Sequence, residues 1–189
     1  MPINAVLNIS EEIVVSPATP EPVTLQEAKD YCKIDTTEDD TLIEQLIVSA
    51  RMTLEKYTGL SFIPKVITAQ LQNDCGGIEL PCGPTPDAID VTLVTAIDGT
   101  VFNESLVQIV GNNFKYVYGP ISGWLQVVYN AGYTTLPTPL KNAILAQVFF
   151  NYHNRGERIG AFRGSDVSYT CDAAKQFAKL YKRVNELSL

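Results

Sequence analysis

The stretch that decides the fold runs from Thr24 to Gly59 and reads TLQEAKDYCKIDTTEDDTLIEQLIVSARMTLEKYTG. It predicts two consecutive helices joined by a short connection. Thr24 is followed three residues later by Glu27, the spacing of a capping box, in which each of the two residues satisfies a free backbone N–H group of the other. The first helix is therefore predicted to start at this pair.

The second helix is predicted to begin at Thr36 or Thr37, because threonine is a favoured N-cap residue. Carboxylates, which favour the positive end of the helix dipole, occupy its first turn: Glu38, Asp39 and Asp40. Apolar residues then recur at steps of three and four, as on one buried helix face: Leu42, Ile43, Leu46, Ile47, Ala50, Leu54 and Tyr57. Gly59 suits the left-handed conformation that ends a helix.

Composition indicates a folded protein that does not bind nucleic acid as its main task. The chain has 189 residues, of which 46% are hydrophobic and 19% charged, enough for one domain or one domain with an insertion. Its net charge of −7 opposes binding to phosphates. No apolar run is long enough to span a bilayer, and residues 1–10 lack the basic start of a secretory signal. We expect a cytoplasmic protein whose four cysteines are free thiols.

Residues 1–22 are predicted to form an extended N-terminal arm. Three prolines fall within six residues, at 17, 20 and 22, and so many prolines exclude a helix. The preceding residues 5–15 are too apolar for a tail that makes no contacts. The arm is expected either to fold back on its own domain or to add a strand to a neighbour.

Residues 65–135 are predicted to form an inserted β region between two helical parts, the first of them residues 23–64. Period-two alternation and β-branched residues indicate five or six short strands, and Asp98-Gly99 is a hairpin signal. Trp124 is expected in the core of one strand. The fold class is therefore α+β: a helical bundle with an inserted antiparallel β region, residues 23–189 forming one structural domain.

Residues 136–189 are predicted to return to helices. Thr138 is an N-cap candidate followed by Pro139 at the first helical position, and the helix is expected to extend to Arg155. Residues 154–170 contain three glycines without periodicity and are expected to form a mobile loop. A last helix is predicted from Asp172 to Leu187, with an apolar stripe of Phe177, Leu180, Tyr181, Val184 and Leu187.

No residue pattern indicates an active site, a metal site or a cofactor. His153 is the only histidine, so a histidine-based triad would depend on it alone; at a helix end it is expected to cap carbonyl groups. The cysteines have no metal-binding spacing. The glycines lack the following lysine and serine or threonine of a phosphate loop. We expect no catalytic residue, no metal and no cofactor.

The ordered motifs together resemble a known family. Its opening pattern is matched by residues 22–29 (PVTLQEAK), 39–47 (DDTLIEQLI) and 57–59 (YTG), and its later part by residues 128–133 (VYNAGY) and the helix over 136–155. These motifs are similar to those of the tailed-phage head–tail connectors, the gp6-like adaptor proteins. One departure is Gly156, which interrupts the Tyr-x-x-Arg-Glu ending of the long helix.

The resemblance implies a structural protein of the phage neck and not an enzyme. Such a protein assembles into a ring, twelvefold by this resemblance, beneath the portal protein. It joins the DNA-filled head to a downstream neck or tail protein and leaves a DNA channel without sequence-specific binding. Residence in the virion after assembly in the host cytoplasm follows. The alternatives are a DNA-binding packaging protein and a different neck component, namely a stopper or tail-completion protein.

Two sets of residues are candidates for contacts in such a ring. The local excess of positive charge and one aromatic residue in the glycine-punctuated loop are candidate contacts with the portal or another partner: Arg155, Arg158, Phe162 and Arg163. The alternative for these residues is a solvated loop. Apolar positions on the two long helices are candidate faces between subunits: Leu42, Leu46, Ile144 and Val148.

Overall fold

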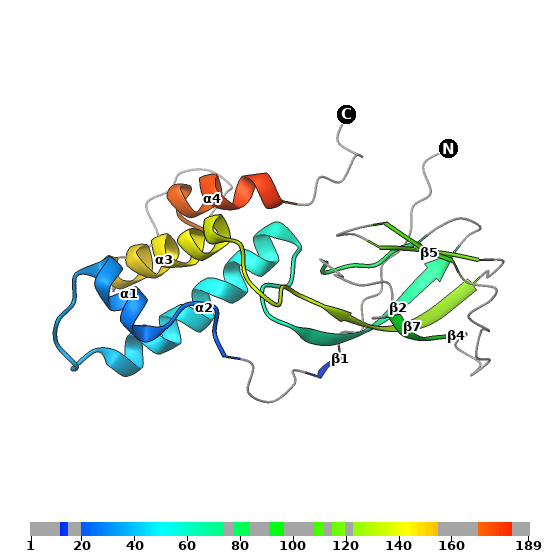
Figure 1. Cartoon of the computed structure of the whole chain (residues 1–189), viewed down its shortest axis with the longest axis horizontal. Helices are drawn as coiled ribbons and strands as arrows, with labels where there is room; N and C mark the ends of the chain where they lie inside the picture. Colours follow the sequence, from blue (N-terminus) through cyan, green and yellow to red (C-terminus); the bar gives the residue numbers. More distant parts are fainter. Residues whose placement is uncertain are drawn as a thin grey trace, which may run out of the picture. The chain divides into compact units, whose positions relative to one another are not determined.

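The computed structural model describes residues 12–14, 20–73, 78–83, 91–96, 108–111, 115–119, 123–154 and 170–182 (Figure 1). The fold is α+β, as the sequence predicts. The chain divides into two compact units: a strand unit of Met1–Thr19 and Ile63–Thr134, and a helical unit of Pro20–Phe62 and Thr135–Leu189. The sequence-based division treats residues 23–189 as one structural domain, whereas the structure groups the N-terminal arm with the β region.

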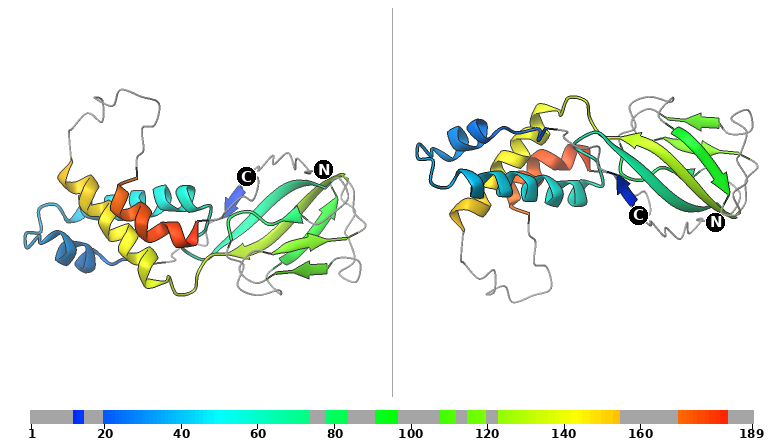
Figure 2. Two further views of the ribbon diagram at one scale, coloured as in Figure 1. Left: turned by 90° about the horizontal axis from the view of Figure 1, so that it is seen from above. Right: turned by 90° about the horizontal axis from the view of Figure 1, so that it is seen from below.

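The helical unit contains α1 (Leu25–Cys32), α2 (Asp40–Thr58), α3 (Thr138–His153) and α4 (Asp172–Ala178), which continues into the 3-10 turn η3 (Lys179–Tyr181). The helix α3 lies at the centre and packs against each of the other three (Figures 1 and 2). The capping box is present: the Glu27 N–H donates to Thr24 Oγ1 over 3.2 Å, and the Thr24 N–H donates to Glu27 Oε2 over 2.9 Å.

The N-cap of α2 lies two or three residues later than predicted. It is Asp39, whose side chain forms no cap hydrogen bond and accepts a hydrogen bond from Tyr152 of α3. The predicted end is confirmed. Gly59 has φ of 71° and its N–H donates to the Glu55 carbonyl over 2.9 Å.

The core of the helical unit takes one face of α2 and most of α3. The buried residues of α2 are Ile43, Ile47, Ala50, Leu54 and Thr58. Those of α3 are Leu140, Ala143, Ile144, Ala146, Gln147 and Val148. Ile144 and Val148 are 0% exposed, so the structure corrects their proposed place on a face between subunits: they are core residues of their own chain. Leu42 and Leu46 are half-buried.

Both ends of α3 differ by one or two residues from the prediction. The N-cap is Pro137, and Thr138 is the first helical residue. The helix ends at His153, before Arg155. The cap is Asn154, whose backbone N–H and Nδ2 both donate to the Phe150 carbonyl, over 3.1 and 2.8 Å. Capping is thus done by the residue after His153.

The helix α4 ends at Ala178, and it buries a different face from the predicted stripe, of which Val184 and Leu187 lie outside the described residues. The backbone is already extended at Lys182, with ψ of 128°. The residues that pack inward are Ala174 and Ala178, whereas Phe177 is 39% exposed and Leu180 86% exposed. Small side chains face the interior because α4 packs against α3 along its length.

The strand unit contains two antiparallel sheets (Figure 2). The first has the order β1-β2-β7-β4, with bounds β1 Glu12–Val14, β2 Lys65–Asn73, β7 Gly123–Ala131 and β4 Val91–Ala96. The second has the order β3-β6-β5, with bounds β3 Ile78–Glu79, β6 Tyr116–Tyr118 and β5 Gln108–Val110. The described part of the inserted region contains six strands, within the predicted five or six, while the Asp98-Gly99 signal lies outside the described residues.

The two long strands β2 and β7 form the centre of the strand unit. They pair over their whole length, from Lys65 opposite Ala131 to Asn73 opposite Gly123. Alternate residues of β7 point inward, among them Leu125, Val127 and Tyr129. Trp124 lies on the other face and is half-buried, so it is not the core residue that the sequence predicts.

The N-terminal arm folds back on its own chain in this structure. Glu12, Ile13 and Val14 pair antiparallel with Thr68, Ile67 and Val66, which makes β1 an edge strand beside β2. This is the first of the two arrangements expected for the arm. The pairing covers the edge of β2, which would otherwise leave backbone donors and acceptors open to another chain.

Candidate functional site

No group of three or more metal-ligating side chains occurs among the described residues. No helix in the described part of the chain is long and apolar enough to cross a membrane. Cys32, Cys82 and Cys171 are free thiols, and burial raises the pKa of the Cys32 thiol, which keeps it protonated and unreactive. The features that remain to be described are the contacts that join the helices and the apolar side chains that stay exposed.

The start of α2 is held by two of the acidic residues noted in the sequence. Lys29 of α1 donates to Asp40 over 2.6 Å, and the Tyr152 hydroxyl of α3 donates to Asp39 over 2.6 Å. Lys29 is largely buried, with 10% of its side chain exposed. Both carboxylates are thus used to join three helices, and they are structural groups.

The capping box also links α1 to α3. The Lys141 ammonium group donates to Glu27 Oε1 over 2.5 Å, while the other oxygen of this carboxylate accepts from Thr24. The hydrogen bond from Lys141 and that from the Thr24 backbone hold the pKa of Glu27 below its usual value. The Glu27 side chain therefore caps α1 and also binds α3.

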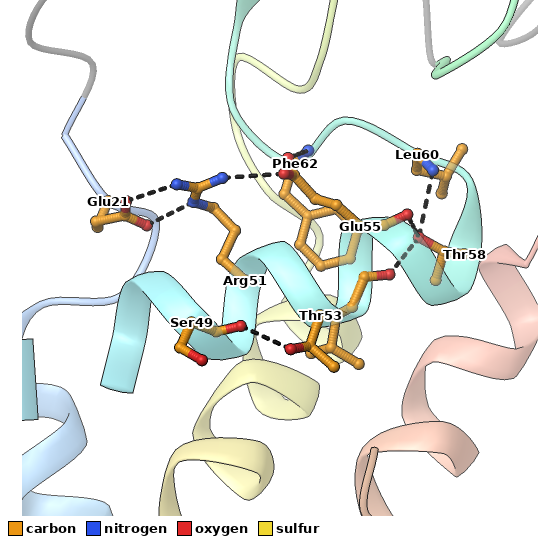
Figure 3. Close-up of polar contacts among 9 residues, drawn as sticks. Glu21, Ser49, Arg51, Thr53, Glu55, Thr58, Leu60 and Phe62 are labelled. Carbon is orange, nitrogen blue, oxygen red and sulfur yellow. Dashed lines mark hydrogen bonds and ion pairs between the residues drawn. The ribbon is translucent and has the colours of Figure 1, made fainter. Parts of the chain in front are cut away.

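Arg51 fixes the segment before α1 against α2 (Figure 3). Its guanidinium group donates to both oxygens of Glu21, over 2.8 and 3.1 Å, and to Glu55 over 2.9 Å. Glu55 in turn accepts the backbone N–H of Phe62 over 2.6 Å. Burial lowers the pKa of Arg51, but the hydrogen bonds and charges of the two carboxylates outweigh it and raise the pKa, so the group remains charged.

A buried amide connects α3 to α4. Gln147 is 0% exposed; its Oε1 accepts the Cys171 N–H over 2.8 Å, and its Nε2 donates to Asn151 over 2.9 Å. Cys171 caps α4 through its sulfur, which accepts the Ala174 N–H over 3.3 Å. These polar links make the helical unit a body whose helices are joined by specific contacts as well as by a core.

Three apolar areas of the helical unit remain exposed. On α2, Val48 and Met52 are 37% and 59% exposed; we call this the α2 surface. On α1 and α3, Tyr31 and Phe149 are 45% and 42% exposed, with ring centroids 6.1 Å apart. His153 extends this α1–α3 surface, since its ring lies 4.2 Å from that of Phe149. The third area is formed by the outward residues of α4 described above.

The strand unit exposes one face of its second sheet. Val110, Tyr116 and Tyr118 are 53%, 36% and 43% exposed. Val110 lies opposite Tyr116 in the register of β5 and β6, and the two tyrosine rings stack with centroids 6.2 Å apart. The other face of β6 buries Val117.

A groove of about 350 Å³ runs beside the α2 surface. It lies between the segment that leads into α1 and the outer side of α2, and its lining is mainly apolar. The lining residues are Pro20, Glu21, Val23, Thr24, Leu25, Glu44, Ile47 and Val48. Val48 thus belongs both to the groove and to the α2 surface.

The structure describes some of the contact residues predicted from the sequence and leaves others outside the described ranges. Arg155, Arg158, Phe162 and Arg163 lie outside the described residues, so their role remains a prediction. Among the helix-face candidates, the two on α2 are half-buried and the two on α3 belong to the core. The exposed residues Tyr31, Val48, Met52 and Phe149 were not selected from the sequence. The sequence could have indicated two of them as exposed, because Val48 and Met52 are apolar but lie off the periodic stripe of α2.

Solved structures with a similar fold come from gene transfer agent (GTA) particles. A chain in the virion of a native GTA particle has a TM-score of 0.69 and 14% sequence identity, with 96% of this chain and 99% of that chain covered. A chain in the neck of the native particle, computed with C12 symmetry, has a TM-score of 0.68 and 16% identity, with 97% and 98% covered. A chain in the neck of the empty particle, computed with C6 symmetry, has a TM-score of 0.65 and 17% identity, with 91% and 96% covered.

Sequence comparison gives the family. No curated protein is significantly similar to the chain. The sequence profile of the family described as "Phage gp6-like head-tail connector protein" matches residues 22–182. This range begins before α1, includes the strands β2 to β7 and ends after η3, so the match spans both compact units. The chain belongs to the phage gp6-like head–tail connector protein family.

Proposed function

We propose that this chain is a connector of the phage neck that assembles into a twelvefold ring beneath the portal protein. In this role it joins the DNA-filled head to a downstream neck or tail protein and leaves a central channel for DNA. The observation that carries the proposal is the family match over residues 22–182. The fold it shares with chains of GTA neck particles, over more than nine-tenths of its length, supports the same role.

The helical unit has the construction that a ring subunit needs. Its helices are joined by the ion pair of Lys29 with Asp40, that of Lys141 with Glu27, and the Arg51 cluster. A subunit joined in this way keeps its shape while DNA pressure and tail attachment act on it. Surfaces for neighbours are then provided by exposed side chains of the same helices, in a head-to-tail arrangement that closes.

The net charge of the chain fits a channel wall that does not bind DNA. The net charge of −7 disfavours binding of phosphates, so a duplex in the channel would slide past the wall. We assign contacts with the portal to Arg155, Arg158, Phe162 and Arg163, because arginine and aromatic side chains are the usual anchors of protein interfaces. The proposed protein is non-enzymatic, needs no cofactor, and is assembled into the virion in the host cytoplasm.

Complementation of a phage that lacks the gene for this chain tests the proposal. Without the chain, we expect DNA-filled heads and separate tails to accumulate. Supplying the chain from a plasmid should restore joined particles, in which cryo-electron microscopy shows twelve copies between portal and tail. Particles that join normally without the chain, or a chain that is absent from the neck of purified virions, would contradict it.

A further inference from the structure

The α2 surface and the α1–α3 surface lie on outward faces of two helices that pack together. Met52 stands two residues from both Ala50 and Leu54, which are buried, and two residues correspond to about 200° around a helix. Phe149 stands two residues from the buried Gln147 of α3. Met52 therefore projects away from the core of the helical unit, while the Phe149 ring lies beside Tyr31 of α1.

Neither surface is needed to hold the helical unit together. The four helices already meet through the residues that are at most a few percent exposed, and their ends are joined by ion pairs. Apolar side chains that gather on the surface of a soluble protein usually mark a place where a partner binds. Two such places on one unit, made of different residues, are what a head-to-tail contact requires.

We infer that the α2 surface of one copy binds the α1–α3 surface of the next copy. This inference rests on the proposed ring, and it specifies which residues form the ring contact. In it, Val48 and Met52 pack against Tyr31 and Phe149 of the neighbour. A contact between two different surfaces repeats around a ring until it closes, whereas a contact of like with like stops at a pair.

Charged side chains of both signs flank each of the two surfaces. Glu44 lies four residues before Val48, and Lys56 lies four residues after Met52, so each charge flanks one end of the α2 surface. Next to Tyr31 stand Asp30, which precedes it, and Lys33, which follows it by two residues. Glu44, Lys33 and Lys56 are exposed, and within the described ranges none of them has an ion-pair partner. Such charges of both signs at each surface would set the register of two copies.

Two charge substitutions and one matched control test the contact. Met52→Glu places a carboxylate in the α2 surface, and Phe149→Glu places one in the α1–α3 surface. Gln176→Glu adds the same charge at an exposed position of α4. The four proteins, wild type included, are purified as full chains, checked for equal thermal unfolding, and titrated onto portal-bearing heads made without this chain. Bound copies per head are then counted.

We expect wild type and Gln176→Glu to bind cooperatively as full rings. Met52→Glu and Phe149→Glu should each bind at least about tenfold more weakly and without cooperativity, because burying an unpaired carboxylate in an interface is costly. An equimolar mixture of these two variants should bind better than either alone. In the mixture, the intact α2 surface of the Phe149→Glu chain meets the intact α1–α3 surface of the Met52→Glu chain, so every second contact is restored.

Two results would contradict the inferred contact, and a third would contradict the proposed function. Wild-type binding together with unchanged binding of both variants would overturn the inferred contact and leave the proposed function standing. A mixture that binds no better than the two variants would overturn the pairing of α2 surface with α1–α3 surface, and would place these residues against the portal or against their own kind. Wild-type chain that fails to bind the heads would overturn the proposed function itself.

Discussion

Lys141 donates to Glu27 over 2.5 Å, and the two residues are 114 positions apart in the sequence. Glu27 closes the capping box of α1, while Lys141 lies in the first turn of α3. The pair therefore joins the two ends of the sequence that enclose the β region. It also links two of the motifs that carry the resemblance to the family, the PVTLQEAK opening and the helix after LP.

The link makes stability depend on pH in a defined direction. The pKa of Glu27 is lowered in the folded chain, so its contribution to stability is present above the unfolded pKa and is lost as the pH falls through the folded pKa. We expect the unfolding temperature of wild type to fall more steeply below about pH 4.5 than that of Glu27→Gln. Circular dichroism melts across the acid range measure this, and identical slopes for the two proteins would contradict it.

Removal of Arg51 should destabilise the helical unit strongly. Its side chain is 12% exposed, and that of Glu55 is 11% exposed, so Arg51→Met leaves two carboxylates close together without a cation. We expect a loss of about 3 kcal/mol in the free energy of unfolding, measured in urea. Lys175→Met is the matched control. It breaks an ion pair with Asp172, whose side chain is 93% exposed, and should cost under about 1 kcal/mol. Equal losses in the free energy of unfolding for the two variants would show that the buried Arg51 cluster stabilises the protein no more than an exposed ion pair does.

Gly132 should not tolerate a side chain. Its φ is +115°, and a Cβ atom there would stand 2.1 Å from the Ile63 carbonyl oxygen. Gly132→Ala must therefore move backbone atoms, and we expect a loss of more than about 3 kcal/mol or a failure to fold. Gly123 has a similar φ of +98° with nothing within 4 Å, so Gly123→Ala reports the conformational strain alone, about 1 kcal/mol. A smaller loss at Gly132 than at Gly123 would contradict the close approach.

The amide of Gln147 should be required for the docking of α4. Gln147→Leu keeps the volume but leaves the Cys171 N–H without its acceptor, and an unsatisfied buried donor costs about 1–3 kcal/mol. Faster hydrogen exchange over residues 171–178, with unchanged exchange over α2, is the expected result. Unchanged exchange of α4 in this variant would show that the apolar contacts with α3 suffice.

Charge reversal tests the arginines assigned to the portal. The triple variant Arg155→Glu, Arg158→Glu and Arg163→Glu should fold like wild type but fail to bind portal-bearing heads, because it reverses the charge of the side chains that are proposed to contact the portal. Head binding is measured by co-sedimentation. Binding at wild-type strength would favour the solvated loop as the interpretation of these residues.

Features set by neighbouring residues were predictable from the sequence. The capping box at Thr24 and Glu27, the left-handed end at Gly59 and the alternation in β7 depend on contacts within a few positions, so their residue types reveal them. The start of α2 was not predictable in this way. Asp39 would cap a helix by residue type, but its carboxylate is bound by Tyr152, which is 113 positions away.

Which apolar residues face inward was decided by the tertiary structure. The sequence of α4 favours Phe177 and Leu180 as the buried stripe, yet close packing against α3 admits only the small Ala174 and Ala178. On α3, in contrast, two residues that the sequence analysis places between subunits are buried in their own chain. Because three helices surround it, Ile144 and Val148 are fully buried and cannot reach a neighbour.

Residue types and their spacing were enough to predict the family, the helices and the strands. Which faces of those helices remain open to other chains depended on how the helices pack. Burial depends on what packs against each face, and the partners of α2 and α3 come from segments about a hundred residues apart. For that reason Tyr31, Val48, Met52 and Phe149 became candidates for the ring contact only once the helices were seen packed together.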